Sequence, residues 1–203
     1  MNDFCMEVYL RYSIGVSMSS EVSRRLFTID DCYRMLDAGI LHEDDRVELI
    51  RGDLLNMSPI GTRHQSVVDG ATRELVRTVG DSAIVRVQGT IELDRFSAPQ
   101  PDLVLLRPRD DLYVHKHPGA PDIFLIIEVA DSSLEYDTTV KLALYAIMGI
   151  HEYWVVDLRN NRLICYSDPD GDYYRTIREF HRGDTVLPSL LSDCRIHVDI
   201  LLP

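Results

Sequence analysis

The sequence predicts an α+β fold with an α/β-type core, in which helices flank a mixed β-sheet. Two observations predict this class. Short segments rich in Val, Ile, Leu and Tyr and bounded by Gly, Pro, Asn or Asp are typical of strands, and three longer segments carry helical spacing or helix-end signals. Their order along the chain is helix, two strands, helix, four strands, helix and three strands. This order indicates helices packed on a mixed sheet.

The first predicted helix follows a segment without a clear pattern. Residues 1–25 show no period, and we treat them as an N-terminal extension whose order the sequence does not determine. Thr28 followed by Asp31 has the spacing of a capping box, and Gly39 is typical of the position just beyond a helix end. A helix is therefore predicted over about 29–38.

A hairpin and a longer helix come next. The alternation of residues 46–50 and 53–57 across Arg51-Gly52 predicts two short strands joined by a tight turn. After a loop, a helix is predicted over 62–79. Its apolar residues fall at helical spacing on one face, at Val68, Ala71 and Leu75.

The remaining elements alternate strands with one further helix. Strands are predicted at 83–88, 90–94, 101–106 and 122–129, with a polar segment between the last two. A helix over 134–148 is indicated by an apolar stripe, and Gly149 ends it. Later strands are predicted at 151–157, 162–167 and 172–179. Residues 26–203 are therefore interpreted as a single domain, a size that can bury a core.

The composition is that of a soluble globular protein. Apolar residues make up 45% of the chain, and no apolar stretch reaches the roughly 18–20 residues needed to span a bilayer. The N-terminus lacks the basic start and apolar core of a signal peptide. The four cysteines match no disulfide or zinc spacing: Cys5, Cys32, Cys165 and Cys194. We therefore expect a cytoplasmic protein with no membrane partner.

The charge balance argues against nonspecific binding to nucleic acid. The formal net charge is −12, whereas such binding normally uses a basic face. It does not exclude binding, because surface charge can segregate and a cluster of metal-binding acids adds to the deficit. Arginines do cluster locally, at Arg73, Arg77 and Arg86 and again at Arg175, Arg178 and Arg182. A mixed solvated surface is the simpler interpretation of these clusters.

Two acids in predicted strands are candidates for a metal site. Glu128 lies in the apolar run IIEVADSS, where a carboxylate is costly unless it is paired, hydrated or bound to a cation. Asp102 begins the strand 101–106. If the two strands are antiparallel neighbours, both acids meet at one edge and on one face of the sheet, where they can share a Mg²⁺ ion. The alternative is a turn cap at Asp102 and a structural ion pair at Glu128.

Three further residues are candidates for the same site. Lys141 lies beside the apolar stripe of its helix and can extend toward the two acids. Spacing alone slightly favours an exposed ion pair between Lys141 and Asp137. His64 lies in the first turn of the helix 62–79, on its apolar face, as a site residue or as a buried histidine satisfied by the backbone. Glu48, between Val47 and Leu49, can equally be a solvent-facing acid.

Five segments taken in order resemble the Uma-type restriction endonuclease family of the PD-(D/E)xK nuclease superfamily. They are RVELIRGDLLNMSPIGTRHQ (46–65), PQPDLVLL (99–106), IIEVADSS (126–133), DTTVK (137–141) and GIHEYWVVD (149–157). The resemblance extends over roughly residues 26–190. It implies a restriction-endonuclease-like fold and Mg²⁺-dependent hydrolysis of phosphodiester bonds in DNA, with Mn²⁺ as a substitute metal. Homodimers are common for this scaffold.

The resemblance also implies roles for individual residues. It makes Asp102 and Glu128 the two metal-binding acids and Lys141 the lysine, displaced onto a helix. Glu48 falls on the family's upstream acid, a further metal ligand, and His64 on its upstream histidine. The compact superfamily motif has lysine where this chain has Ala130, so the site is complete only if Lys141 reaches the acids. The alternative function is a nuclease-fold module that binds protein or nucleic acid without cutting. A hydrolase of small phosphoesters ranks third and would need a closed pocket.

Overall fold

A computed structural model describes residues 24–202. The predicted extension of residues 1–25 lies outside the described residues, apart from Arg24 and Arg25. None of the helices in the described part of the chain is long and apolar enough to cross a membrane.

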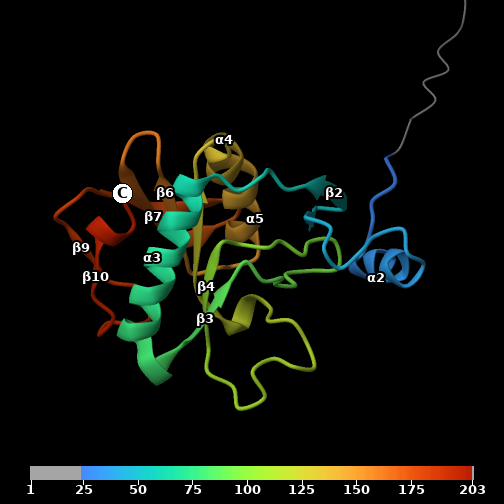
Figure 1. The fold of residues 1–203 in the computed structure, drawn as a ribbon, viewed down its shortest axis with the longest axis horizontal. Coiled ribbons are helices and arrows are strands. Elements are labelled where there is room, and N and C mark those ends of the chain that lie inside the picture. The colour runs from blue at the N-terminus through green and yellow to red at the C-terminus, as the bar shows by residue number, and fades with distance from the viewer. Residues whose placement is uncertain (1–23, 203) are drawn as a thin grey trace, which may run out of the picture.

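A six-stranded sheet runs through the centre of the molecule (Figure 1). In spatial order its strands are β3 (Ile84–Val87), β4 (Leu103–Leu106), β5 (Ile123–Ala130), β6 (Glu152–Asp157), β7 (Arg162–Asp170) and β8 (Tyr173–Phe180). β5 and β6 are parallel, and the other neighbouring pairs are antiparallel. The prediction of a mixed sheet is confirmed.

Helical segments cover both faces of this sheet (Figure 1). On one face lies α3 (Thr62–Val79), close to the C-terminal elements β9 (Thr185–Val186), β10 (Ile196–His197) and η4 (Val198–Ile200). On the other lies the helical segment 134–147. Two short 3₁₀ turns complete the set, η1 (Gly80–Ser82) and η2 (Ala120–Asp122).

Two apolar cores form because residues alternate between the faces of the central strands. Leu103 and Ile127 pack in the core under α3, whereas Val104 and Ile126 pack in the core under the helical segment 134–147. By the same period of two, Asp102 and Glu128 belong to the second face. The two candidate acids therefore project from one side of the sheet, as predicted.

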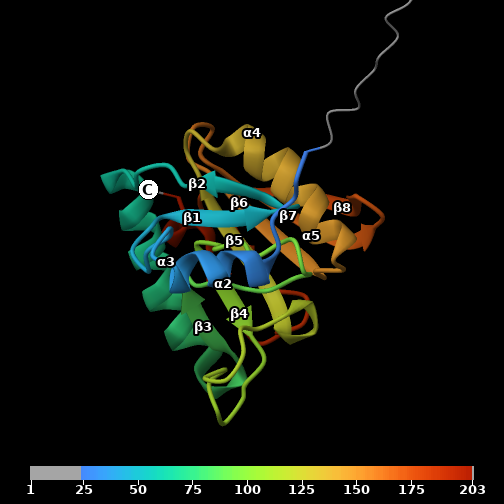
Figure 2. The same ribbon diagram turned by 90° about the vertical axis from the view of Figure 1, so that its right-hand side faces the viewer.

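A separate hairpin lies beside the first helix (Figure 2). β1 (Val47–Ile50) pairs with β2 (Asp53–Asn56), next to α2 (Ile29–Asp37). Arg51 and Gly52 at the turn have φ of 51° and 84°, the two positive values that a type I′ hairpin turn requires. The predicted hairpin is confirmed.

The predicted start and end of α2 are also confirmed. The Thr28 hydroxyl accepts the Asp31 N–H at 3.1 Å, and the Asp31 carboxylate accepts the Thr28 N–H at 2.9 Å, which completes the capping box. Gly39, just after the helix, has φ 66°. Both ends of this helix are therefore set by interactions local in the sequence.

The predicted strand at 90–94 is wrong. Gln88 has φ 46° and turns the chain away from the sheet. Beyond it, the Ile91 N–H donates to Pro99 O at 3.1 Å and the Leu93 N–H to Ser97 O at 3.0 Å, so the segment folds onto the following loop. An apolar residue of this segment is buried although the segment is a loop, since Ile91 is fully buried there.

The third predicted helix forms, but its middle turn is π-helical. It consists of α4 (Leu134–Tyr136), the π turn η3 (Asp137–Lys141) and α5 (Leu142–Ile147). Inside it, the hydroxyls of Thr138 and Thr139 donate to the carbonyls of Leu134 and Glu135 at 2.7 and 2.6 Å. Such bonds compete with the backbone ladder and favour a widened turn.

Candidate active site

Asp102 and Glu128 lie side by side at one end of the sheet. β4 and β5 are antiparallel with Leu103 opposite Ile127, so the next positions outward are Asp102 and Glu128. The Asp102 N–H donates to Oε2 of Glu128 at 3.3 Å. The two strands are antiparallel neighbours, the condition under which the sequence allowed the acids to meet, and each acid has partners beyond those of a turn cap or a simple ion pair.

Lys141 reaches these acids from the π turn. Its Nζ lies 2.9 Å from Oε1 of Glu128 and 3.3 Å from Oε2 of Glu48 on β1. The lysine is 5% exposed, so the expectation of a surface pair with Asp137 is wrong. Asp137 is buried too, and it accepts the Ser133 hydroxyl at 2.6 Å. The widened turn directs both charged side chains inward, where the carboxylates of two other elements meet the ammonium group.

His64 contacts the first acid directly. Its Nε2 lies 2.9 Å from Oδ2 of Asp102, which also accepts the Val129 N–H at 2.9 Å. Since a carboxylate only accepts, Nε2 carries the proton in this contact. The backbone-satisfied alternative for His64 is therefore wrong. Within residues 24–202, Nδ1 of His64 and the hydroxyl oxygen of Tyr136 are buried without a hydrogen-bond partner.

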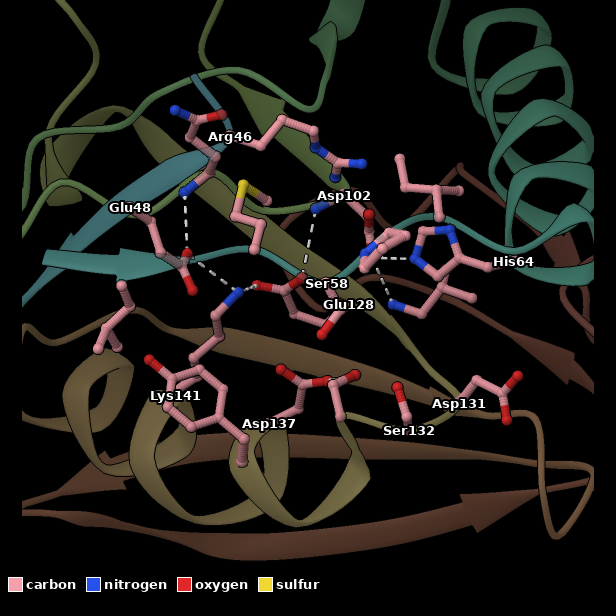
Figure 3. Close-up of a pocket in the computed structure, with 18 of the residues that line it drawn as sticks. Arg46, Glu48, Ser58, His64, Asp102, Glu128, Asp131, Ser132, Asp137 and Lys141 are labelled. Atoms are coloured by element: carbon pink, nitrogen blue, oxygen red, sulfur yellow. Dashed lines mark hydrogen bonds and ion pairs between the residues drawn. The ribbon is translucent and has the colours of Figure 1, made fainter. Parts of the chain in front are cut away.

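These side chains line one cavity of about 570 Å³ that is open to solvent (Figure 3). Its walls come from β1, the loop before α3, the start of β4, the end of β5 and the π turn. Figure 3 shows Lys141 between Glu48 and Glu128, with His64 approaching Asp102 from the other end. The lining includes five carboxylates, at Glu48, Asp102, Glu128, Asp131 and Asp137.

The pKa values of Glu128 and Lys141 are both raised, for different reasons. Burial raises the pKa of Glu128 to about 8, although Lys141 opposes the rise. Neighbouring Asp137, Asp102 and Glu48 add to it. Burial would lower the pKa of Lys141, but Glu128 and Glu48 outweigh it, so the pKa of the ammonium lies above its usual value. Lys141 therefore stays charged, and Glu128 is an acid whose ionised form the surrounding carboxylates disfavour.

Asp102 and Asp137, two further buried acids of the cavity, differ from each other. Burial acts to raise the pKa of Asp102, but hydrogen bonds from His64 and the Val129 N–H outweigh it and hold that pKa below its usual value. Burial raises the pKa of Asp137, against the opposing effects of Lys141 and Ser133. Of Asp102, Asp137 and Glu128, Asp102 is thus the acid that stays ionised most readily.

The donor set suits a hard cation that keeps part of its water shell. Mg²⁺ is commonly held by one or two carboxylates, with waters and substrate phosphates as the remaining ligands. Asp102 and Glu128 offer two adjacent carboxylates facing an open cavity. Within residues 24–202, no three His, Cys, Asp or Glu side chains are grouped to hold an ion by themselves. The arrangement fits Mg²⁺ shared with substrate and does not fit a closed protein cage.

Sequence reasoning missed two side chains of this site. Tyr145 on α5 donates to Oε1 of Glu128 at 2.9 Å, and its helical spacing from Lys141 was the available signal. Gln88 donates to Oδ1 of Asp102 at 3.3 Å. The Gln88-Gly89 dipeptide is a turn signal, but nothing in the sequence directs this turn toward Asp102.

Comparisons with known proteins agree with this architecture. A crystal structure of a "putative nuclease belonging to DUF820" from Anabaena variabilis ATCC 29413 is similar with a TM-score of 0.64 and 16% sequence identity. The similarity covers 86% of this chain and 97% of that chain, and at this identity it concerns the fold. No curated protein matches the chain significantly. The model of the Uma2 family, described as "Putative restriction endonuclease", matches residues 29–199. The chain therefore belongs to the Uma2 family and has a nuclease-like fold.

Proposed function

We propose that the protein is a Mg²⁺-dependent endonuclease that hydrolyses phosphodiester bonds in DNA. The observation that carries this proposal is the approach of Lys141 Nζ to within 2.9 Å of Glu128, beside Asp102, in an open cavity. The lysine lies on a helix, thirteen residues after Glu128, and supplies the cation that Ala130 lacks. A site with two acids and a lysine has the groups needed to bind a metal and a phosphate together.

Each residue has a proposed role. Asp102 and Glu128 hold Mg²⁺, and Glu48 is either a further ligand or the second partner of Lys141. A bound Mg²⁺ supplies positive charge for the scissile phosphate and makes the attacking water more acidic. Lys141 orients that water or neutralises charge that develops on the phosphate. His64 keeps Asp102 ionised and oriented through their 2.9 Å contact.

Three further features belong to this proposal. Mn²⁺ substitutes for Mg²⁺, since both take oxygen ligands. A homodimer brings two sites to the two strands of a DNA duplex. A cytoplasmic location gives the enzyme access to DNA.

Cleavage of a supercoiled plasmid with Mg²⁺ or Mn²⁺ tests the proposal. We expect the wild type to cut and both Asp102→Ala and Lys141→Ala to lose on the order of a hundredfold in rate, which is roughly 3 kcal/mol of transition-state stabilisation. Glu135→Ala, at an exposed position of α4, is the matched control and should cut normally. Cutting that persists in Asp102→Ala would sink the assignment.

A binding module without cleavage is the second candidate. It is favoured by the net charge of −12 and by the engagement of Lys141 with two carboxylates, which leaves its ammonium less available to a phosphate. Calorimetric titration with Mn²⁺ separates the two functions. Binding that disappears in both Asp102→Ala and Glu128→Gln favours the endonuclease, and its absence in the wild type favours the binding module.

A further inference from the structure

Glu128 presents its two carboxylate oxygens to different surroundings. Oε1 accepts two hydrogen bonds, from Lys141 Nζ and from the Tyr145 hydroxyl, both at 2.9 Å. The only donor from residues 24–202 to Oε2 is the Asp102 N–H, at 3.3 Å. A carboxylate oxygen has two lone-pair positions, so Oε1 is saturated and Oε2 keeps one position open.

The Tyr145 hydroxyl is held rigidly in this contact. Tyr145 is fully buried, and its ring packs edge-on against Tyr153 with 4.9 Å between centroids. The Tyr153 hydroxyl in turn donates to the carbonyl of Asp137 at 3.0 Å, inside the π turn. The same pair of tyrosines therefore braces Glu128 on the strand and the helical turn that carries Lys141.

The phenol is the donor in this contact. Because a carboxylate oxygen only accepts, the Tyr145 hydroxyl directs its proton at Oε1 across 2.9 Å. A donor of this kind fixes a carboxylate rotamer more firmly than a lysine alone, because its ring has only two side-chain torsions and both are packed.

We propose that Tyr145 is a positioning residue of the site: together with Lys141 it holds Oε1 of Glu128, so that Oε2 alone is presented to a divalent cation. This inference rests on the proposed function, because it assumes that Glu128 is a metal ligand. Tyr145 does not touch the reacting atoms. Without its hydroxyl, the carboxylate can rotate and offer either oxygen, and the geometry of the cation and water is lost.

The test compares two isosteric changes that each remove one buried hydroxyl. Tyr145→Phe removes the donor to Glu128, whereas Tyr174→Phe removes a donor to the Ile150 carbonyl at 2.9 Å, away from the cavity. We expect Tyr145→Phe to weaken Mn²⁺ binding by about tenfold in calorimetry, the usual size of an effect on a residue behind a metal ligand. Tyr174→Phe should bind Mn²⁺ like the wild type, although its melting temperature falls.

Kinetics give a second measurement that a purely structural role would not change. On DNA, Tyr145→Phe should lower kcat at saturating Mn²⁺ and leave KM for DNA within about twofold, since DNA contacts are untouched. A Mn²⁺ affinity of Tyr145→Phe within twofold of the wild type overturns the inference while leaving the endonuclease intact. A wild type that neither binds Mn²⁺ nor cuts DNA overturns both. Equal loss of Mn²⁺ affinity in both tyrosine variants also overturns the inference, because the effect is then one of core stability.

Discussion

At the scale of single residues, the main feature of the cavity is that its buried carboxylates outnumber its buried ammonium group. Glu48, Glu128 and Asp137 are each less than 7% exposed and share one buried ammonium, that of Lys141. Removing charges from water is costly, and an ion pair offsets this cost only when every charge has a partner. The surplus carboxylate is retained at the bottom of an open cavity, which is where a cation would relieve it.

This imbalance predicts a dependence of stability on pH in metal-free buffer. Folded Glu128 has a pKa of about 8, against 4.5 for the ordinary group, so it binds its proton more tightly in the folded state. The contribution of Glu128 to the free energy of unfolding is therefore complete below about pH 4.5 and is lost as the pH rises toward 8. From pH 5 to 8.5 the unfolding free energy of Glu128→Gln should decrease by about 3 kcal/mol less than that of the wild type. Urea denaturation in EDTA measures this difference.

The control for this experiment is Glu135→Gln, which changes an exposed glutamate of α4. It should reproduce the pH profile of the wild type. If Glu128→Gln retains the full wild-type slope, the titration of Glu128 does not cause the pH dependence and the electrostatic account of the cavity is wrong.

At the scale of elements, local signals and tertiary contacts contribute differently to the helices. α2 has no buried residues, so its stability depends on its caps more than on packing. The helical segment 134–147 has a buried face, and its π turn includes two buried charged residues. The first helix was therefore predictable to its ends, whereas the turn type of the third was not.

The cap of α2 gives a prediction at this scale. Thr28→Ala removes the side-chain acceptor of the Asp31 N–H and should destabilise the helix by about 1 kcal/mol. We expect faster hydrogen exchange of the α2 amides, with plasmid cleavage unchanged because α2 contributes no residue to the cavity. Thr28→Ser keeps the hydroxyl and should exchange like the wild type. Unchanged exchange in Thr28→Ala would show that the cap contributes nothing measurable.

At the scale of the whole molecule, the net charge of −12 opposes approach to DNA. If the proposed function is right, the acids of the cavity add to this repulsion where the scissile phosphate would lie. A bound divalent cation would then make the cavity attractive to a phosphate. Binding of DNA should therefore depend on the cation and only weakly on the protein surface.

Fluorescence anisotropy with a labelled DNA duplex checks this expectation. At about 0.1 M salt we expect no saturable binding in EDTA and at least tenfold tighter binding with Ca²⁺, which occupies oxygen sites without supporting rapid cleavage. Asp102→Asn should lose most of the Ca²⁺ effect. Tight binding in EDTA would instead indicate a basic face, and the clusters around Arg73 and Arg175 would be the first candidates.

The sequence by itself determined most of the elements and their order, the mixed sheet and the position of Asp102 and Glu128 at strand ends. These follow from apolar periodicity, caps and turns, which depend on residues close together in the chain. The capping box at Thr28 and the hairpin turn at Arg51-Gly52 are examples of such local control. Family resemblance then pointed to Lys141, against the slight preference of its spacing for the surface.

Only the tertiary structure decided where Lys141, Tyr145 and Gln88 lie. Each depends on groups far away in the chain: Lys141 on Glu48, Tyr145 on Glu128, and Gln88 on Asp102. The strand expected at 90–94 failed for the same reason, because its backbone found partners in a loop. Periodicity records which residues are apolar, whereas the free energy of burying a charge depends on which remote partners surround it.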